Sequence, residues 1–584
     1  MHASDSQAAS TPDVSSASFS FSWRCVLFLS CASALLLAAA YPPLNLWPLA
    51  WVAPIGWLML IRVDTLPKRS YWWIYLSGFL FWMTVLHGIG NAHWATRLLG
   101  WPILCSYLAV YTPLFVGLSR LLVLRAYVPL PLAAPVVWTG LEYIRAHFAT
   151  GFSIAQLGHT QATVPLLIQV AEFTGAYGVG FAMLLVLGLA VAALPGARRH
   201  PATRQLPLWL ARTGLIVCSL LMAVGYVVWG TMLFHASSKL EWGYSHGGQR
   251  DPVEPVKIGL VQGSIDTVFG DPTQSERTFE QYTALTDHLV QNHPNLDLIV
   301  WPETTMGDHM VFEIGADFAA PKDLKIDEAE FRKRILERAD GFNGFLHDLG
   351  VNRWKSPLLL GTSVVRYGNQ RMEHANAAIY VGHEGTIVTR YDKVHPVMFG
   401  EYVPLGDYVP WIYDLLPIGG GLTPGKGPVT VDVDGVSLVP CICFENTVPH
   451  LVAGQVRELD QAGIDVDALV TLTNDGWFWG SSILDLHLAC ARFRAVENRR
   501  PMLVAANTGI SAVIDSQGKL LQYSPTRKTT YLVADVAPTV RPISSYTKNG
   551  DWFAGLCLTL TVIGAIAGWI VSRRPPPTAP QKGN

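Results

Sequence analysis

Charged residues are scarce in this sequence: Asp, Glu, Lys and Arg together make up 15% of its 584 residues. Soluble globular domains contain about 25%, so the composition of the whole chain does not match that of an ordinary soluble protein. The formal net charge of −2 also lacks the basic excess that binding to nucleic acid requires. We therefore expect a membrane protein and no nucleic-acid partner.

Cysteine is scarce as well, with eight residues in the chain. Five of these lie in apolar runs, where a thiol behaves as a small hydrophobic group: Cys25, Cys31, Cys105, Cys218 and Cys557. The other three, Cys441, Cys443 and Cys490, form no disulfide framework. Together with His450 and His487 they also lack the paired spacing of a zinc site, so we expect neither a metal nor another cofactor.

Long apolar runs occupy the first part of the chain and return near its end. Eight stretches are long and apolar enough to be membrane spans, near residues 24–40, 44–61, 71–93, 99–119, 127–144, 164–194, 208–234 and 552–571. We predict a membrane domain of seven spans over 23–235 and an eighth span within 550–572. An alternative for the first run is a cleavable signal peptide ending near Ala38-Ala39-Ala40. Residues 1–22 are Ser- and Ala-rich and are predicted to be a disordered tail.

The short loops between the predicted spans indicate an orientation. Every loop after an even-numbered span is basic: Arg62, Lys68 and Arg69; Arg120 and Arg125; Arg198, Arg199 and Arg204; and finally Arg573 and Arg574. Basic loops remain on the cytoplasmic side, so the C-terminal tail 573–584 is predicted to be cytoplasmic. The loop after the seventh span then lies outside the cytoplasm, and it contains residues 250–540.

Residues 250–540 have the pattern of a layered α/β domain with mixed sheets. Short β runs alternate with predicted helices near 274–292, 327–348 and 484–498. Runs 377–381 and 386–391 flank a His-Glu-Gly turn, and runs 429–433 and 436–443 flank Asp-Gly, so both pairs are predicted hairpins.

Three residues with complementary chemistry each follow a predicted strand: Glu303, Lys393 and Cys443. Brought together, they could open an ester or amide through an acyl-thiol intermediate. The carboxylate would take the thiol proton, the thiolate would attack the carbonyl, and the ammonium would balance the oxyanion. The alternatives are a surface charge for Glu303, a solvated turn residue for Lys393 and a buried structural thiol for Cys443.

Cys441 is a second candidate for the nucleophile. It lies two residues before Cys443, where the period of a strand places both side chains on the same face. Composition alone does not choose between these two thiols.

Six motifs in this half resemble the nitrilase-like carbon–nitrogen hydrolases. They are Trp301-Pro-Glu303, Tyr391-Asp-Lys393 with Phe399-Gly-Glu-Tyr-Val-Pro404, Cys443-Phe-Glu445, Asn474-Asp-Gly-Trp-Phe478, Arg492-Phe-Arg-Ala-Val-Glu497 and Ala506-Asn-Thr-Gly509. Together with the flanking spans, the chain resembles the apolipoprotein N-acyltransferases over nearly its full length. This resemblance implies a polytopic helical membrane domain and a four-layer αββα domain on the extracytoplasmic (periplasmic) side of a bacterial cytoplasmic membrane.

The resemblance also implies an activity: transfer of an acyl chain from a phospholipid donor to the N-terminal amine of a diacylglyceryl-cysteine lipoprotein. Cys443 would carry the acyl group as a thioester, Glu303 would be the general base, and Lys393 would hold the oxyanion with the backbone N–H of Phe444. Glu401 and Glu445 would support Lys393. Two further residues, Asn474 and Trp477, would shape the acyl site.

Three features depart from the family pattern. After Gln262-Gly263 the usual Trp is missing and only Phe269 is a candidate substitute; Phe444 stands where Tyr is commoner; and the segment 306–355 is long enough to suggest a lid. These departures leave two other functions open. One is a membrane-tethered amidase that gives the acyl group to water, and the other is a non-catalytic membrane scaffold.

Overall fold

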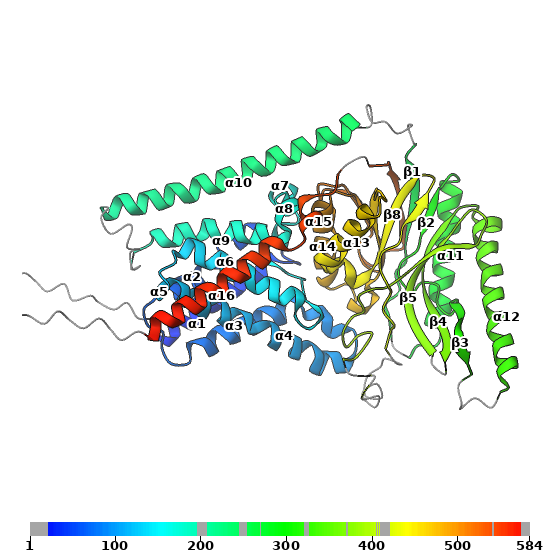
Figure 1. Cartoon of the computed structure of the whole chain (residues 1–584), viewed down its shortest axis with the longest axis horizontal. Coiled ribbons are helices and arrows are strands. Elements are labelled where there is room, and N and C mark those ends of the chain that lie inside the picture. The colour runs from blue at the N-terminus through cyan, green and yellow to red at the C-terminus, as the bar shows by residue number, and fades with distance from the viewer. Residues whose placement is uncertain are drawn as a thin grey trace, which may run out of the picture.

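The chain folds into a helical half and an α/β half, which lie end to end in Figure 1. The computed structural model describes residues 21–195, 207–244, 254–268, 270–320, 326–369, 372–404, 406, 408, 421–539 and 542–573. Most of the two predicted tails, the basic residues Arg198, Arg199 and Arg204, and Phe269 lie outside these described residues.

Each of the eight predicted apolar runs contains at least one helix. Their helices include α1 (Trp23–Ala40), η1 (Trp47–Trp51) with α2 (Ile55–Arg62), α3 (Ser70–Val85), α4 (Trp101–Ala109) with α5 (Tyr111–Leu124), α6 (Leu130–His147), the short α7 (Pro165–Ile168) and α8 (Ala171–Thr174) with α9 (Ala176–Ala193), α10 (Leu208–Tyr244) and α16 (Trp552–Arg573). Five helical stretches of the described chain are long and apolar enough to cross a membrane: Trp23–Ala40, Thr96–Leu124, Ala176–Ala193, Trp209–His235 and Trp552–Ser572. The prediction of a polytopic helical region is therefore confirmed, whereas the number of eight spans stays a prediction.

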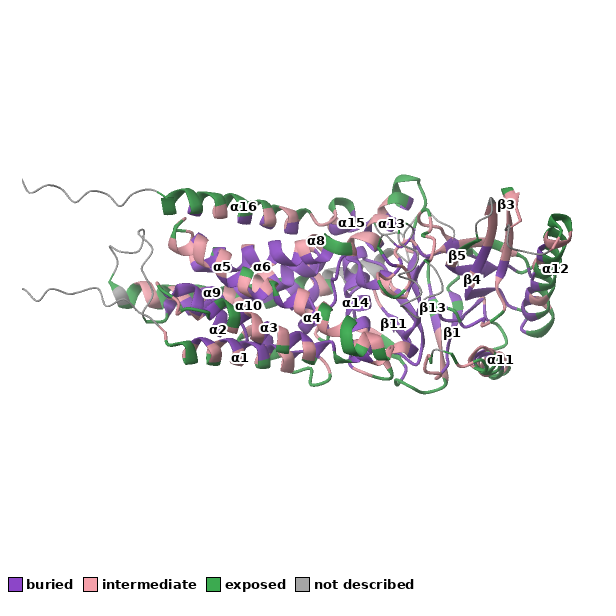
Figure 2. Cartoon of the chain, turned by 90° about the horizontal axis from the view of Figure 1, so that it is seen from below, coloured by how far each residue is buried: buried purple, intermediate pink, exposed green. Residues whose placement is uncertain are grey.

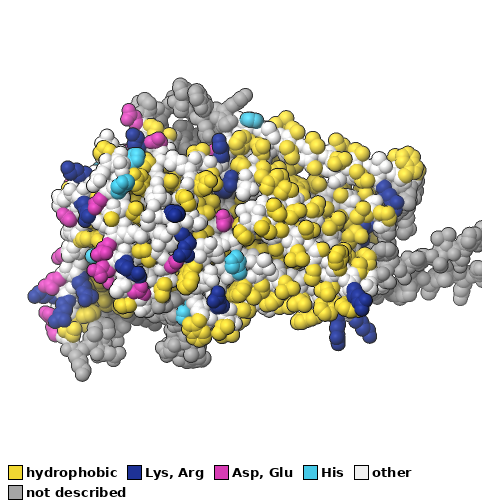
Figure 3. Space-filling view, turned by 180° about the vertical axis from the view of Figure 1, so that it is seen from behind, with side chains coloured by type: hydrophobic (Ala, Val, Ile, Leu, Met, Phe, Trp, Pro, Cys, Tyr) yellow, Lys and Arg dark blue, Asp and Glu magenta, His cyan; other side chains and the backbone are white. Residues whose placement is uncertain are grey.

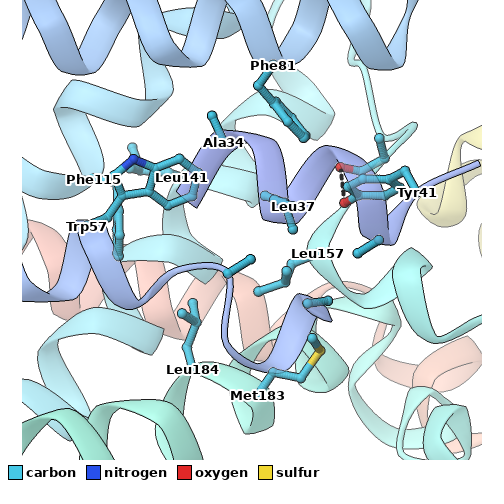
Figure 4. Packing of buried hydrophobic residues seen from close by; sticks show 14 of the residues in the cluster. Ala34, Leu37, Tyr41, Trp57, Phe81, Phe115, Leu141, Leu157, Met183 and Leu184 are labelled. Carbon is cyan, nitrogen blue, oxygen red and sulfur yellow. Dashed lines mark hydrogen bonds between the residues drawn. The ribbon is translucent and has the colours of Figure 1, made fainter. Parts of the chain in front are cut away.

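Helix α6 packs closely on two other helices through small residues. A Cβ added to Gly140 of α6 would lie 2.9 Å from the Cα of Leu558 in α16, and one added to Gly188 of α9 would lie 2.9 Å from the Cα of Pro131 in α6. Only glycine permits backbones to approach so closely, as is common between membrane helices. Figure 4 shows large side chains such as Trp57 and Phe115 filling the space between the remaining helices.

The surface of the helical half is itself apolar. Helix α10 lies at the edge of the helical half in Figure 1, where it packs on α9, and it exposes large hydrophobic side chains, including Leu221, Val224 and Met232. In Figure 3, hydrophobic side chains cover the helical half, while acidic and basic ones gather over the α/β half. An apolar surface of this extent requires contact with lipid rather than water.

Two sheets form the centre of the α/β half. The first has the order β13-β1-β2-β4-β5-β6, with β3 also paired to β4, and the second has the order β12-β11-β10-β9-β8-β7. Their strands are β1 (Val256–Gln262), β2 (Leu298–Val300), β3 (Val311–Ala319), β4 (Leu358–Asn369), β5 (Met372–Val381), β6 (Ile387–Asp392), β7 (Val431–Val433), β8 (Val436–Ile442), β9 (Ala468–Asn474), β10 (Met502–Asn507), β11 (Ala512–Ile514), β12 (Leu520–Tyr523) and β13 (Thr530–Val536). The antiparallel pairs β5–β6 and β7–β8 confirm both predicted hairpins.

Helices cover the outer face of each sheet, which confirms the expected four-layer αββα order. Helices α11 (Gln274–Asn292) and α12 (Glu328–His347) share a buried cluster with the first sheet. Helices α13 (Pro449–Gln461) and α14 (Ile483–Asn498) share one with the second. A third cluster, between the sheets, joins residues such as Leu260 and Leu438. Figure 2 shows buried segments in strands such as β4 and β5.

Helix α14 lies between the α/β half and the membrane half, and it is buried along its whole length. Its Ala491 and Ala495 pack on the second sheet, whereas Ile483, Leu486 and Phe493 pack into the membrane-half cluster. Helix α14 is therefore one of the elements that join the two halves, and it does so through two apolar faces.

The long segment 306–355 is a packed part of the first sheet's outer layer. It contains β3, α12 and the π-helical turn Asp348–Arg353, and Met306, Phe342 and Leu346 are buried. In Figure 1, α12 lies at the end of the molecule farthest from the helical half. The suggestion that this segment is a lid stays an untested prediction.

Candidate active site

The three predicted residues meet at the ends of three strands. Glu303 lies three residues after β2, Lys393 directly follows β6, and Cys443 directly follows β8. Lys393 Nζ is 3.1 Å from Glu303 Oε1. Both side chains also interact electrostatically with the Cys443 thiol, so one site contains the carboxylate, the ammonium and the thiol.

Lys393 is held between two carboxylates. Its Nζ donates to Glu401 Oε1 at 2.7 Å as well as to Glu303, and only 1% of its side chain is exposed. Burial alone lowers the pKa of the ammonium, but the two carboxylates outweigh that effect and raise the pKa well above its usual value. Lys393 is therefore a fixed positive charge at neutral pH.

Glu303 is fixed at both of its carboxylate oxygens. Oε1 accepts a hydrogen bond from Asn376 Nδ2 at 2.7 Å in addition to that from Lys393, and Oε2 accepts one from the backbone N–H of Asn474 at 2.9 Å. Thr304, the next residue, has a φ of 54°, so the chain turns sharply after the carboxylate. The carboxylate is thereby oriented on a rigid support.

The backbone conformation at Cys443 places the two candidate thiols in different parts of the domain. Cys443 has a φ of 53°, in the left-handed region that residues other than glycine rarely adopt. Because of this turn, Cys443 packs against the cluster between the sheets, whereas Cys441 lies in the cluster on the outer face of the second sheet. The expectation that both thiols share one face is wrong, because the regular strand period ends at Ile442.

The environments of these two thiols also differ. Cys441 is buried, its Sγ lies 2.9 Å from Thr471 Oγ1, and burial raises its pKa to about 12. Cys443 is half-buried and lies within the electrostatic influence of Glu303 and Lys393. Burial and the Glu303 carboxylate raise the pKa of Cys443 well above its usual value, and Lys393 only partly opposes them. Cys443 is therefore a neutral thiol at rest, next to a carboxylate that could accept its proton.

Glu445 connects the loop at Lys393 to the loop at Cys443. Its Oε1 accepts from the backbone N–H groups of Val394 and His395 at 2.7 and 3.0 Å, and its Oε2 accepts from Ile442 N–H at 2.7 Å and the Tyr391 hydroxyl at 2.9 Å. Burial raises the pKa of this carboxyl. Glu445 thus holds the backbone on both sides of the site, whereas Glu401 contacts the Lys393 ammonium directly.

The remaining predicted residues lie around the site in different ways. Asn474 orients Glu303 through its backbone, and its side chain donates to Thr304 Oγ1 at 3.2 Å. Trp477 is half-buried on the following turn, and its role in acyl binding stays a prediction. Phe444 stacks on His395 with ring centroids 5.9 Å apart and packs against the membrane-half cluster.

Sequence reasoning missed a buried pair that contacts the nucleophile's backbone. His487 Nε2 lies 3.0 Å from the Cys443 carbonyl oxygen, and its Nδ1 lies 3.1 Å from Asp475 Oδ1. Burial lowers the pKa of His487, but Asp475 outweighs burial and the net pKa is raised. No local motif could reveal this pair, because its members lie on different elements and meet only in the folded chain.

A helical, lipid-exposed half joined to a four-layer α/β domain with a buried Glu, Lys and Cys defines a membrane-attached protein of the nitrilase-like class. Two family models agree with this architecture. Residues 33–189 match the apolipoprotein N-acyltransferase N-terminal domain, and residues 257–544 match the carbon-nitrogen hydrolase family.

Relatives of full length extend the match. The apolipoprotein N-acyltransferase of Rhodopirellula baltica is 30% identical over 580 residues, covering 93% of this chain and 98% of that protein. That of Geobacter metallireducens is 32% identical over 546 residues, covering 92% and 94%. The chain belongs to the apolipoprotein N-acyltransferase family.

Two solved structures each match about half of the chain. Saccharomyces cerevisiae Nit3, a member of branch 10 of the nitrilase superfamily, is 18% identical with a TM-score of 0.34, covering 49% of this chain and 91% of that one. An amidase from Nesterenkonia sp. is 16% identical with a TM-score of 0.33, covering 50% and 93%.

Proposed function

We propose that the protein transfers a fatty acyl chain from membrane phospholipid to the N-terminal amine of diacylglyceryl-cysteine lipoproteins, through a thioester on Cys443. The observation that carries the proposal is the buried Glu303–Lys393 pair beside the Cys443 thiol. Family membership supplies the substrate classes, lipoprotein and phospholipid.

The first half-reaction forms the thioester. Glu303 accepts the thiol proton as Sγ attacks the ester carbonyl of the phospholipid, and a carbon–sulfur bond forms. Lys393, with the backbone N–H of Phe444, balances the negative charge on the carbonyl oxygen. The ester carbon–oxygen bond then breaks, and the departing lysophospholipid oxygen takes the proton from Glu303.

The second half-reaction releases the acyl chain as an amide. The lipoprotein amine attacks the thioester carbonyl and gives a proton to Glu303, Lys393 again balances the oxyanion, and the carbon–sulfur bond breaks. The proton returns to Cys443. The raised pKa of Cys443 supports base catalysis in this cycle, because a neutral thiol must lose its proton as it attacks.

The position of the catalytic loops supports lipidic substrates. Phe444 and Phe478 pack against the membrane-half cluster, and Asn91 Nδ2 donates to the Phe478 carbonyl at 3.2 Å. The neighbouring stretch exposes large apolar side chains, among them Trp94 and Leu98. Two substrates with long acyl chains could therefore approach from the bilayer.

The distribution of basic residues over the helical half supports an extracytoplasmic position for the α/β half. In Figure 3, Lys and Arg side chains appear at the end of the helical half that lies away from the α/β half. Arg120, near that end, donates to the carbonyls of Leu60 and Val63. Basic residues at one end of a membrane domain favour the cytoplasmic side for that end.

The proposal is tested with full-length protein in detergent and a phospholipid that is labelled in its acyl chain. With an acceptor lipopeptide, the label should move to the peptide's amine, and Cys443→Ala should abolish the transfer. Label released only as free fatty acid, with or without acceptor, would favour the amidase alternative. Absence of any covalent label on the protein or the peptide would favour the scaffold.

A further inference from the structure

Three side chains outside the proposed chemistry meet where the two halves join. His147 is the last residue of α6, His450 lies in the first turn of α13, and Asp551 directly precedes α16. One nitrogen from each imidazole and one carboxylate oxygen all lie within 4.8 Å of one another. The membrane half, the α/β half and the start of the last helix each contribute one residue.

We propose that His147, His450 and Asp551 form a binding site for a divalent transition metal, with Zn²⁺ as the ion that best fits the donor set. His147 Nε2 is 3.4 Å from Asp551 Oδ2, and His450 Nδ1 is 3.8 Å from the same oxygen. Tetrahedral zinc with bonds of 2.0–2.1 Å separates its ligand atoms by about 3.4 Å. Shifts of a few tenths of an ångström would bring both nitrogens to that separation from the carboxylate.

Groups around the cluster hold two of the ligands in the required orientation. The Nδ1 of His147 lies 3.0 Å from the Tyr143 carbonyl oxygen, to which it can only donate, so the lone pair of this ring lies on Nε2. The Tyr546 hydroxyl donates to Asp551 Oδ1 at 2.5 Å, and the Tyr177 hydroxyl donates to Oδ2 at 3.4 Å, so Oδ2 has one further lone pair for an ion. Metal-binding histidines and carboxylates typically carry supporting bonds of this kind.

The third proposed ligand atom is Nδ1 of His450. Among the described residues, the buried Nδ1 of His450 has no hydrogen-bond partner. The imidazoles of His450 and His147 stack face to face, with centroids 4.2 Å apart and planes 19° apart, so one ring must rotate about its side-chain bonds for both lone pairs to reach one ion. The side chains of His450 and His147 are 32% and 34% exposed, whereas that of Asp551 is 6% exposed.

A bound ion would connect the two halves near the catalytic loops. Helix α13 begins two residues after the turn Cys443–Thr447, and α6 and α16 pack on each other within the membrane half. Zinc at this junction would have three protein ligands from three elements. Its expected effect is to fix the α/β half on the membrane half, without any part in the thiol chemistry.

The test uses full-length protein in detergent, purified without a polyhistidine tag and stripped with a chelator. Titration with Zn²⁺ against a competing indicator should give one site per chain and a raised Tm. Tyr546→Phe, which removes only the supporting hydroxyl, should weaken binding about 10–100-fold. His147→Gln and His450→Gln should weaken it more.

A matched control comes from an exposed pair with a similar spacing. His383 Nε2 lies 3.7 Å from Asp434 Oδ1, so His383→Gln removes a histidine beside a carboxylate but leaves the proposed site intact. Its zinc affinity should equal that of the unaltered protein. Zinc binding that survives in both His147→Gln and His450→Gln, or no binding at micromolar Zn²⁺, would overturn the proposal.

A second measurement needs no variant and therefore does not depend on the folding of one. Diethyl pyrocarbonate modifies accessible neutral imidazoles, and peptide mapping locates the modified histidines. Zn²⁺ should protect His147 and His450 and leave His383 reactive. Equal modification of His147 and His450 with and without Zn²⁺ would refute a site at these residues.

Discussion

Replacing Glu303 and Lys393 in turn should separate the base from the oxyanion partner. Glu303→Gln keeps the size of the side chain but cannot take the thiol proton, so acylation of Cys443 at neutral pH should fall 10²–10⁴-fold, which is about 3–5 kcal/mol. The Glu303 carboxylate also helps to raise the pKa of Cys443, so the variant thiol should ionise at lower pH. Its acylation rate should then rise about tenfold per pH unit until that pKa is reached.

Lys393→Met should respond to pH in a different way. Loss of the ammonium removes the charge that balances the oxyanion, worth roughly 3–4 kcal/mol by analogy with other oxyanion donors. The ammonium also lowers the pKa of Cys443, whereas the neighbouring carboxylates raise it, so the substitution makes the thiol harder to ionise. High pH should therefore restore little activity.

The assay is the rate of acyl-mass gain on the intact protein, measured from pH 6 to pH 10. A control is needed because Lys393→Met leaves Glu303 and Glu401 as buried carboxylates without their cation, which can destabilise the fold. Lys393→Met with Glu401→Gln removes one charge of each sign and restores the local balance. If this double variant keeps the Tm but acylates at a normal rate, or if both single variants are rescued equally by pH, the assigned roles are wrong.

Three further predictions concern the thiol, the topology and the buried histidine. Phospholipid should add one acyl mass that neutral hydroxylamine removes, in Cys441→Ala but not in Cys443→Ala; the reverse result would make Cys441 the nucleophile. A cysteine replacing Lys333 should react with an impermeant reagent in cells or spheroplasts, and one replacing Lys68 should not; reversed labelling would overturn the topology. Since the folded state raises the pKa of His487 above its ordinary 6.5, the stability that its pairing gives is complete below pH 6.5 and lost as pH rises through the raised pKa. His487→Gln should therefore lower Tm more at pH 6 than at pH 9, and a pH-independent loss would refute a charged pair.

Much of the fold could be predicted from local patterns. The apolar runs located the helical half, and the Asp-Gly turn located the β7–β8 hairpin, because hydrophobic length and turn chemistry act within a few residues. Helix α13 was missed, although Pro449 stands at its first position, a typical start. The short strand β12 carries no clear sequence signal, since its side chains are largely exposed and show little apolar periodicity.

Only the site residues that lie in recognisable sequence motifs could be predicted. Glu303, Lys393 and Cys443 each follow a strand within a recognisable motif, but β2 and β6 lie in the first sheet and β8 lies in the second, so their meeting also depends on how the two sheets pack. Asn376 and His487 carry no such mark, because each becomes part of the site only when β5 pairs with β6 and when α14 packs on the second sheet. Their roles depend on tertiary packing, which the sequence alone did not reveal.

The geometry at Cys443 explains why a glutamate two residues later belongs to the nucleophile motif. A left-handed conformation costs a residue other than glycine about 1–3 kcal/mol and persists only when its surroundings fix it. Glu445 fixes the residue before Cys443 through the Ile442 N–H, while His487 contacts the Cys443 carbonyl. The same carboxylate holds the two backbone N–H groups that follow Lys393. One buried side chain thus sets both the strained turn that presents the thiol and its separation from the ammonium, so a change at Glu445 should disturb the two together.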